Sequence, residues 1–170
     1  MEAVILIGIQ GAGKSTFYRE RFFDTHVRVS LDLLKTRRRE RTLLEACLAT
    51  GQPLVIDNTN VTQPERARYI PLAKAAGFRV VGYFFVPDPQ GSRERNDRRE
   101  GMRRVPPAGL FGTLKRLEPP RAAEGFDALF AASLSPTGEF AVKPWDGAGG
   151  GGSVPEFIRL LRTVAQEHNS

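Results

Sequence analysis

Short apolar runs alternate with amphipathic stretches along most of the chain. The apolar runs have the length of buried strands and occupy residues 3–8, 27–30, 54–57, 80–86 and 128–134. Helical patterns begin between them, at Lys14, Leu31, Gln63 and Pro106. This alternation is typical of short parallel strands joined by right-handed crossovers. It therefore predicts an α/β fold with a parallel sheet of about five strands and flanking helices.

One helix in this pattern has both of its ends marked by local chemistry. Thr62 is followed three residues later by Glu65, with Pro64 between them, which is the spacing of a capping box with proline tolerated in the first turn. Gly77 is suited to closing the same helix, because glycine adopts the left-handed conformation at a helix C-terminus without strain. The sequence predicts a helix from Gln63 to about Gly77.

The alternation weakens after Leu134. Residues 147–152 are rich in glycine, and because no Lys-Ser follows them we interpret them as a flexible connector. A second capping box, Ser153 to Glu156, opens a stretch in which apolar residues recur at helical spacing. This predicts one domain over residues 1–146 and a C-terminal helix over 153–168 that docks on it. The alternative is that the apolar stripe of this helix binds a partner.

Composition narrows the class of protein. A chain of 170 residues with 41% hydrophobic residues is long enough for one domain with a good core. The first eight residues are too short for a membrane span and carry Glu2, so we expect a first strand, no membrane association and a cytoplasmic protein. Cys47 lies at helical spacing from leucines and predicts core packing. His26 and His168 have no partner at ligand spacing, so a zinc site is not supported.

A glycine-rich motif follows the first predicted strand. Residues 8–15 read Gly-Ile-Gln-Gly-Ala-Gly-Lys-Ser, and a helical pattern follows them. This spacing lets successive backbone N–H groups surround phosphate oxygens, and the helix N-terminus points at the same anion. We expect Lys14 to reach the β- and γ-phosphates and Ser15 to ligate Mg²⁺. The predicted contacts to ATP come from Gly11, Ala12, Gly13, Lys14, Ser15 and Thr16.

Two aspartates follow later strands at the edge of the sheet where ligands of parallel sheets bind. Asp32 falls in the first turn of the next helix, across the predicted cleft from Lys14, and we interpret it as a general base. The alternative for Asp32 is a favourable interaction with the helix dipole. Asp57 follows the third strand and is interpreted as a residue that organises metal water or acceptor contacts. The alternative for Asp57 is an Asx turn.

Positive charge is concentrated in two segments. The formal net charge is +6, which favours a polyanionic partner, although a basic balance also serves solubility. The first segment, Lys35–Arg41, follows Asp32, and we expect it to track acceptor phosphates. The second segment, Arg93–Arg104, follows the fourth strand.

The second basic segment has the pattern of a lid. Arg95 and Arg99 share a helix face, and no acidic residue lies between them on that face. We expect both guanidinium groups to close over the triphosphate, and Arg99 to act as a catalytic group that stabilises charge in the transition state. The alternative is a solvated helix, because Glu94 and Arg98 have the spacing of an i,i+4 ion pair.

Taken in order, several motifs resemble the kinase module of 5′-hydroxyl polynucleotide kinases. They are Gly-Ile-Gln-Gly-Ala-Gly-Lys-Ser-Thr, Val-Ser-Leu-Asp, Val-Ile-Asp-Asn-Thr-Asn, Arg-Ala-Arg-Tyr, the Arg-Asn-x-Arg-Arg lid and Glu-Gly-Phe-Asp, and they lie between Val4 and Leu134. The resemblance implies a P-loop kinase domain over residues 1–146, with a lid over about 88–105. It implies phosphorylation of a DNA or RNA 5′-OH end by ATP and Mg²⁺.

The resemblance also carries residue roles. It implies that Asp32 is the base, that Asp57 organises acceptor and lid, and that Arg95 and Arg99 contact phosphates. Several family members have an arginine three residues after the base, where this chain has Lys35, and a lysine lacks the bidentate fork. Arg38, one turn further on, is a candidate to replace it.

The sequence leaves open two functions other than a polynucleotide kinase, and it carries no second catalytic module. No phosphatase or ligase module accompanies the kinase motifs, which implies that such partners are separate proteins. One alternative function is a P-loop kinase of a small metabolite. The other is an ATP-binding switch or NTPase that transfers no phosphate to an acceptor.

Overall fold

The computed structural model describes residues 1–101 and 105–147 of the chain. The predicted helix over 153–168, and the predicted connector beyond Gly147, lie outside the described residues. Among those described, no helix has both the length and the apolar character needed to cross a bilayer.

The fold is centred on one six-stranded sheet with the strand order β2-β3-β1-β4-β5-β6. Its strands are β1 (Glu2–Ile7), β2 (Val27–Val29), β3 (Leu54–Ile56), β4 (Arg79–Phe85), β5 (Ala128–Leu134) and β6 (Phe140–Pro144). The first five strands are parallel, and β6 is antiparallel to β5. The α/β class and the five expected strands are confirmed. The sixth strand was not predicted, because its five residues follow a tight turn and are only partly buried.

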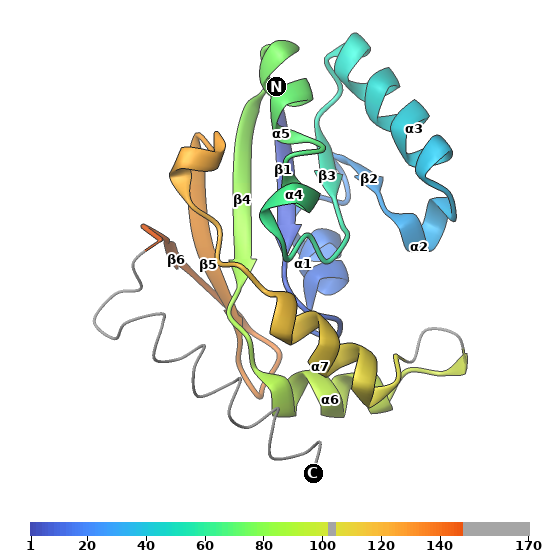
Figure 1. The fold of residues 1–170 in the computed structure, drawn as a ribbon, viewed down its shortest axis with the longest axis vertical. Coiled ribbons are helices and arrows are strands. Elements are labelled where there is room, and N and C mark those ends of the chain that lie inside the picture. The colour runs from blue at the N-terminus through green and yellow to red at the C-terminus, as the bar shows by residue number, and fades with distance from the viewer. Residues whose placement is uncertain (102–104, 148–170) are drawn as a thin grey trace.

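Helices connect the strands and cover the sheet. They are α1 (Lys14–Arg21), α2 (Leu31–Leu34), α3 (Arg37–Thr50), α4 (Gln63–Arg66), α5 (Ile70–Ala75), α6 (Pro89–Asp97) and α7 (Pro107–Arg116), with a 3-10 turn at Ala122–Glu124. Figure 1 shows α6 and α7 at the end of the sheet toward which the arrows of β1 and β4 point, and α3 on the side opposite β6.

The helix expected from Gln63 to Gly77 is in fact two short helices. Its predicted start is confirmed, because Thr62 and Glu65 form the reciprocal capping box. The helical run is interrupted at residues 67–69 and restarts at Ile70, with Pro71 in its first turn. Proline has no N–H to donate to an earlier carbonyl, so it is suited to the start of a helix and not to its interior.

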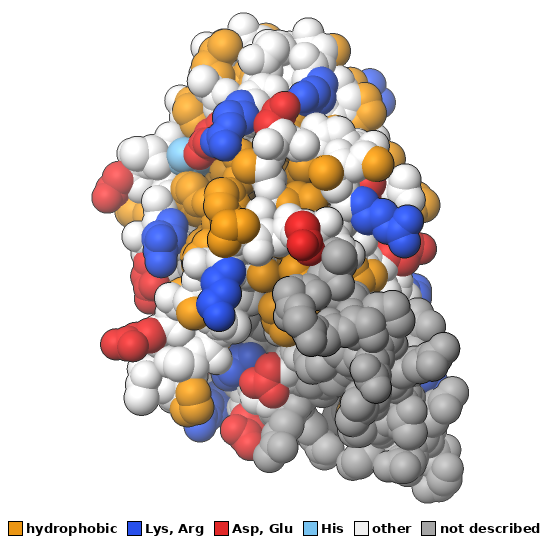
Figure 2. Space-filling model, turned by 90° about the vertical axis from the view of Figure 1, so that its left-hand side faces the viewer, with side chains coloured by type: hydrophobic (Ala, Val, Ile, Leu, Met, Phe, Trp, Pro, Cys, Tyr) orange, Lys and Arg blue, Asp and Glu red, His pale blue; other side chains and the backbone are white. Residues whose placement is uncertain are grey.

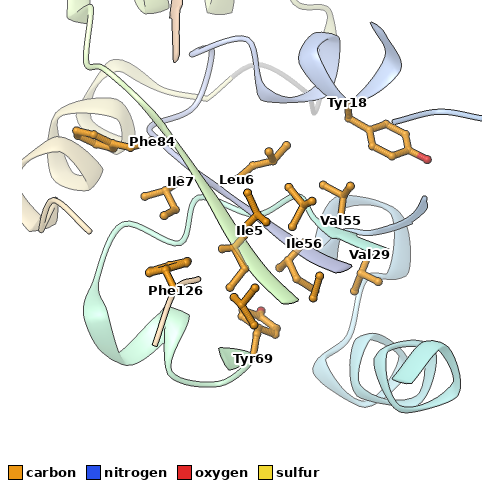
Figure 3. Close-up of a cluster of buried hydrophobic side chains, with 14 of the residues drawn as sticks. Ile5, Leu6, Ile7, Tyr18, Val29, Val55, Ile56, Tyr69, Phe84 and Phe126 are labelled. Carbon is orange, nitrogen blue, oxygen red and sulfur yellow. The ribbon is translucent and has the colours of Figure 1, made fainter. Parts of the chain in front are cut away.

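The core surrounds the central strand β1. Ile5, Leu6 and Ile7 are at most 1% exposed, as expected for a parallel strand with both faces covered. In Figure 3, Ile5 and Ile7 point toward Tyr69 and Phe126, whereas Leu6 points to the other face. The predicted core position of Cys47 is also confirmed, because its side chain is buried in the same cluster.

The sheet edge formed by β6 has a mixed surface. Figure 2 shows this side of the molecule, where basic and acidic side chains are interspersed around an apolar area. The first basic segment of the sequence lies elsewhere, running from Lys35 at the end of α2 into the start of α3.

Candidate active site

The glycine-rich segment leaves β1 as a tight loop and leads into α1. Gly11 and Gly13 adopt φ values of 75° and 96°, a region that side chains rarely enter. A Cβ added to Gly13 would also lie 3.2 Å from Leu134 and from Phe140. The loop is fixed to the next strand connection by a hydrogen bond from the Gly8 N–H to the Thr59 carbonyl, 2.9 Å long. These constraints explain why glycine is needed at these two positions.

Lys14 lies inside this loop. Its ammonium group is buried and donates hydrogen bonds of 2.8 Å to the carbonyls of Gly8 and Ile9. Burial lowers the pKa of Lys14 from 10.5 to about 8. The charge of Arg99 lowers this pKa further, whereas the carboxylates of Asp57 and Asp32 raise it. Three residues singled out in the sequence therefore act electrostatically on one buried ammonium group.

Ser15 and Asp57 meet beside the loop. The Ser15 hydroxyl donates to Asp57 Oδ2 at 3.0 Å, and the Asp57 side chain is only 3% exposed. The carboxyl ends of β1 and β3 are neighbours in the sheet, which is why residues 42 positions apart come together. A third residue, Arg28 of β2, completes the cluster and was missed by sequence reasoning. Its Nε and Nη2 lie 2.8 Å and 2.7 Å from Asp57 Oδ2.

Asp32 is exposed in the first turn of α2. The start of this short helix is held by the strand connection that contains Asp57, because the Leu31 N–H donates to Asn58 Oδ1 at 2.9 Å. Asn58 therefore links the helix that carries the predicted base to the loop that carries Asp57.

A buried polar network holds Asn58 in turn. The Asn58 amide donates to Glu40 and to the Tyr69 hydroxyl, and Tyr69 donates to Glu40 at 2.7 Å. Burial, followed by the hydrogen bond and charge of Glu40, raises the pKa of Tyr69 to about 12, so its hydroxyl stays a donor. Arg37 donates to both Glu40 and Tyr69 and supplies the balancing positive charge.

Helix α6, which carries the predicted lid arginines, contacts the glycine-rich loop directly. Arg95 Nε donates to the Gly11 carbonyl at 2.5 Å. Burial lowers the pKa of Arg95, and the nearby Asp88 and Glu94 carboxylates oppose this effect. Asp88 also caps α6 by accepting from the Gly91 N–H. The position of Arg95 against Gly11 is what closure of a lid requires, whereas the role of Arg99 rests on its charge acting on Lys14.

The predicted acceptor residues flank α2. Lys35 is exposed and ends the helix with a φ of 71°, which turns the chain toward α3. Arg38 is exposed on α3 and lines a hollow of about 490 Å³ whose apolar wall includes Leu34 and Leu43. Thr16, in the first turn of α1, is half-buried.

The donor set fits a nucleotide with Mg²⁺. Hard oxygen ligands from one hydroxyl and one carboxylate, here Ser15 and Asp57, suit a Mg²⁺ ion whose remaining ligands are phosphates and water. Within the described part of the chain, no group of three or more His, Cys, Asp or Glu side chains offers an all-protein metal cage. Lys14 and the backbone N–H groups at the start of α1 fit the phosphates themselves.

Comparison with known proteins places this geometry in a family. A family model described as AAA domain matches residues 4–120, more than half of the chain. A protein of Acanthamoeba polyphaga mimivirus, provisionally named a bifunctional polynucleotide phosphatase/kinase, is 32% identical over 89 residues. That match covers 52% of this chain and 21% of the viral protein, so it spans about a fifth of the relative's length.

Solved structures share the fold. A gluconokinase from Sinorhizobium meliloti is similar over 98% of this chain and 93% of its own, with 18% identity and a TM-score of 0.53. Kti12 of Chaetomium thermophilum, solved in complex with ADP-AlF3, is similar over 97% of both chains, with 16% identity and a TM-score of 0.55. At these identities the likeness concerns the P-loop kinase fold and not the substrate.

Proposed function

The chain belongs to this AAA domain family, and from that premise we propose that it is a phosphotransferase that moves the γ-phosphoryl group of ATP to the 5′-hydroxyl of DNA or RNA. The observation that carries the proposal is the buried Lys14 ammonium group inside the glycine-rich loop, with the Ser15–Asp57 pair beside it and Arg95 of α6 hydrogen-bonded to the Gly11 carbonyl. Asp32, in the first turn of α2, is the proposed base. A base, a metal-site carboxylate and a lid cation at one phosphate-binding lysine are the parts that phosphoryl transfer needs.

Each residue has a defined task in the proposed reaction. The N–H groups of residues 11–16 and the Lys14 ammonium bind the phosphates, and Arg95 and Arg99 cover them from α6. Ser15 and Asp57 hold Mg²⁺, which supplies charge neutralisation on the phosphate oxygens when it is bound. Asp32 accepts the proton of the attacking 5′-hydroxyl as the new oxygen–phosphorus bond forms and the bond to ADP breaks.

The choice of a polynucleotide acceptor has separate support. The viral relative is named for a polynucleotide kinase activity, and its match covers the half of the chain given above. The chain also places the basic stretch Arg37, Arg38 and Arg39 at the start of α3, next after the helix of Asp32. Clustered cations beside a base suit an acceptor that carries several phosphates.

Incubation with γ-labelled ATP and Mg²⁺ tests the function. The acceptors are 5′-OH DNA and RNA oligonucleotides, a panel of sugars and other metabolites, and no acceptor, with a 5′-phosphorylated oligonucleotide as the matched control. We expect label at the 5′ end of the 5′-OH oligonucleotide alone. Label on a metabolite would show a small-molecule kinase, and label only in inorganic phosphate would show an NTPase. Either result contradicts the proposal.

Replacement of the base sharpens the same assay. Asp32→Asn should lower kcat by a factor on the order of 10² to 10⁴, the range for a positioned general base. ATP binding, measured with a fluorescent analogue, should be retained, because Asp32 is exposed on α2 and does not form the loop. Glu45→Gln, an exposed carboxylate on α3, is the control and should leave kcat unchanged. Near-normal turnover of the Asp32 variant would remove it from the mechanism.

A further inference from the structure

Arg28 is the one member of the Ser15–Asp57 cluster that the proposed reaction does not use. It lies in the middle of β2, where Arg28 and Val55 are register partners. Its guanidinium group reaches along the sheet to the connection after β3. Nε and Nη2 both contact Asp57 Oδ2, and Nη2 also donates to Ser15 Oγ at 3.1 Å.

Arg28 donates hydrogen bonds to Ser15 Oγ and Asp57 Oδ2, which are oxygens that suit a divalent metal ion. Asp57 Oδ2 accepts from Ser15 Oγ and from two nitrogens of Arg28, so its acceptor capacity is filled. A carboxylate that is 3% exposed also needs a positive partner, and Arg28 is the cation in contact with it. A divalent cation that binds Ser15 Oγ and Asp57 Oδ2 must therefore displace Arg28 from both atoms, and one that binds the other carboxylate oxygen still meets the guanidinium charge beside it.

The surroundings of Arg28 allow such an exchange. Its side chain is 29% exposed, whereas Asp57 is almost fully buried. The guanidinium carbon lies 5.9 Å from the centroid of the Tyr18 ring, so an aromatic surface is available beside the cluster. The arginine can leave the carboxylate toward solvent without losing every favourable contact, and Asp57 cannot follow it.

We propose that Arg28 is a built-in competitor of the divalent cation at the Ser15–Asp57 pair. Its effect is to make binding of the bare metal weak, so that Mg²⁺ enters the site together with the phosphates of a nucleotide. This inference rests on the nucleotide-binding part of the proposed function and is independent of the acceptor. It makes Arg28 a positioning residue that sets the order in which ligands bind.

Metal binding without nucleotide tests the proposal. Mn²⁺, a paramagnetic substitute for Mg²⁺, is titrated into the wild-type protein and Arg28→Met and followed by electron paramagnetic resonance. We expect Arg28→Met to bind Mn²⁺ at least about tenfold more tightly, because a neutral, unbranched side chain leaves Asp57 without a competing cation. Arg21→Met is the matched control, since Arg21 also lies over an aromatic ring, that of Phe17, and should bind Mn²⁺ as the wild type does.

Thermal melting gives a second readout that does not depend on activity. In EDTA, Arg28→Met should melt at a lower temperature than the wild type, because the buried carboxylate has lost its partner. Added Mg²⁺ should raise the melting temperature of Arg28→Met more than that of the wild type. Asp57→Asn introduced into Arg28→Met should abolish both the tighter Mn²⁺ binding and the response to Mg²⁺.

The outcomes separate this proposal from the proposed function. A folded Arg28→Met protein that binds Mn²⁺ no more tightly than the wild type would overturn it and leave Arg28 a purely structural partner of Asp57. If Arg28→Met does not fold, Arg28→Lys takes its place, because a lysine cannot reproduce the two-nitrogen contact and should also bind Mn²⁺ more tightly. Failure of label transfer to 5′-OH ends leaves these metal measurements unaffected.

Discussion

At the scale of single residues, Lys14 is an ammonium group in a buried position that disfavours its charged form. Its folded-state pKa of about 8 lies below the ordinary value of 10.5, chiefly because of burial. Below pH 8 the lysine is protonated in both states, and burying its charge lowers the stability of the fold by about 3 kcal/mol. Triphosphate binding places negative charge beside this ammonium group. The attraction between the two offsets the unfavourable free energy of burying the Lys14 charge, and so favours binding of the ligand.

This balance makes stability depend on pH. Between pH 8 and 10.5 the unfolded chain binds more protons at Lys14 than the folded protein, so the Lys14 contribution to unfolding free energy rises with pH. Lys14→Met has no charge to bury. We expect its unfolding free energy relative to the wild type to be highest near pH 7 and to fall by about 3 kcal/mol as the pH approaches 10.5.

Urea unfolding at pH 7, 8, 9 and 10 measures this difference. The hydrogen bonds that Lys14 gives to Gly8 and Ile9 add a term that stays constant while the lysine remains a donor, so the slope with pH is the diagnostic quantity. Equal m values for the two proteins would show that both unfold between comparable states. A difference that does not change with pH would contradict the lowered pKa.

At the scale of elements, one buried side chain holds the end of α6, the helix of the predicted lid. Asn96 is 1% exposed and pairs with the backbone of Val105, accepting from its N–H at 2.8 Å and donating to its carbonyl at 2.5 Å. These two bonds join the C-terminal end of α6 to Val105. Because Arg95 adjoins Asn96 in α6, the same contacts fix the helix that lies against Gly11.

Asn96→Ala should therefore disturb the position of α6 against the glycine-rich loop more than it lowers the stability of the whole fold. We expect KM for ATP to rise and kcat to fall, because both lid arginines lose their fixed positions, with a stability loss of about 1 to 3 kcal/mol from the unpaired Val105 groups. Steady-state kinetics and limited proteolysis of residues 96–105 measure the two effects. Ser133→Ala, an exposed change on β5, is the control. Unchanged kinetics in a destabilised Asn96 variant would assign this residue to folding alone.

The elements also show which information is local in the sequence. The strands of the parallel sheet and the Thr62 cap were predicted to within about one residue, because apolar runs and capping spacings are read from neighbouring positions. The break at Pro71 and the strand β6 were not predicted. The break has a local signal that the prediction did not use, because Pro71 would lie in the interior of a helix from Gln63 to Gly77. Strand β6 depends on tertiary context, because it exists only by pairing with β5.

The residues of the candidate site also fall into two groups, those with a local signal in the sequence and those without one. Gly8 to Ser15 form a continuous motif, and Asp32 and Asp57 follow apolar strands, so their positions could be predicted while their roles stay predictions. Arg28 and the network of Asn58, Glu40 and Tyr69 carry no local signal, because their partners lie 11 to 32 residues away in the chain. A polar residue in the centre of a short strand, as Arg28 is, was the one signal available.

At the scale of the whole molecule, a buried arginine connects distant segments. The Arg66 side chain is 0% exposed, and its Nε and Nη2 donate to Oε1 and Oε2 of Glu124 at 2.7 and 3.1 Å. It also donates to the carbonyls of Asn60 and Glu118. The loop after β3, helix α4 and the segment before β5 are thereby held by a single side chain.

Removal of Arg66 should therefore be costly. Arg66→Met leaves the buried Glu124 carboxylate without its cation, and the carbonyls of Asn60 and Glu118 without this donor, so we expect a loss of about 3 to 5 kcal/mol in unfolding free energy. Arg116→Met, which removes an exposed partner of Glu65, is the control and should cost at most about 1 kcal/mol. Urea denaturation measures both values. Similar small losses for the two variants would mean that the buried pair contributes little to holding these segments.

The charge of the whole molecule bears on the acceptor. A net charge of +6 with a basic helix start on α3, on the side away from β6, predicts that acceptor binding releases counterions. The KM for a 5′-OH oligonucleotide should rise with salt, and Arg38→Ala should reduce the slope of log KM against log salt by roughly 0.7. Arg79→Ala is the matched control, because Arg79 is exposed at the start of β4, the opposite end of the sheet from Lys14 and Asp57. An acceptor KM that ignores salt while turnover persists would exclude phosphate tracking by α3, and equal slopes for both variants would move the contact away from Arg38.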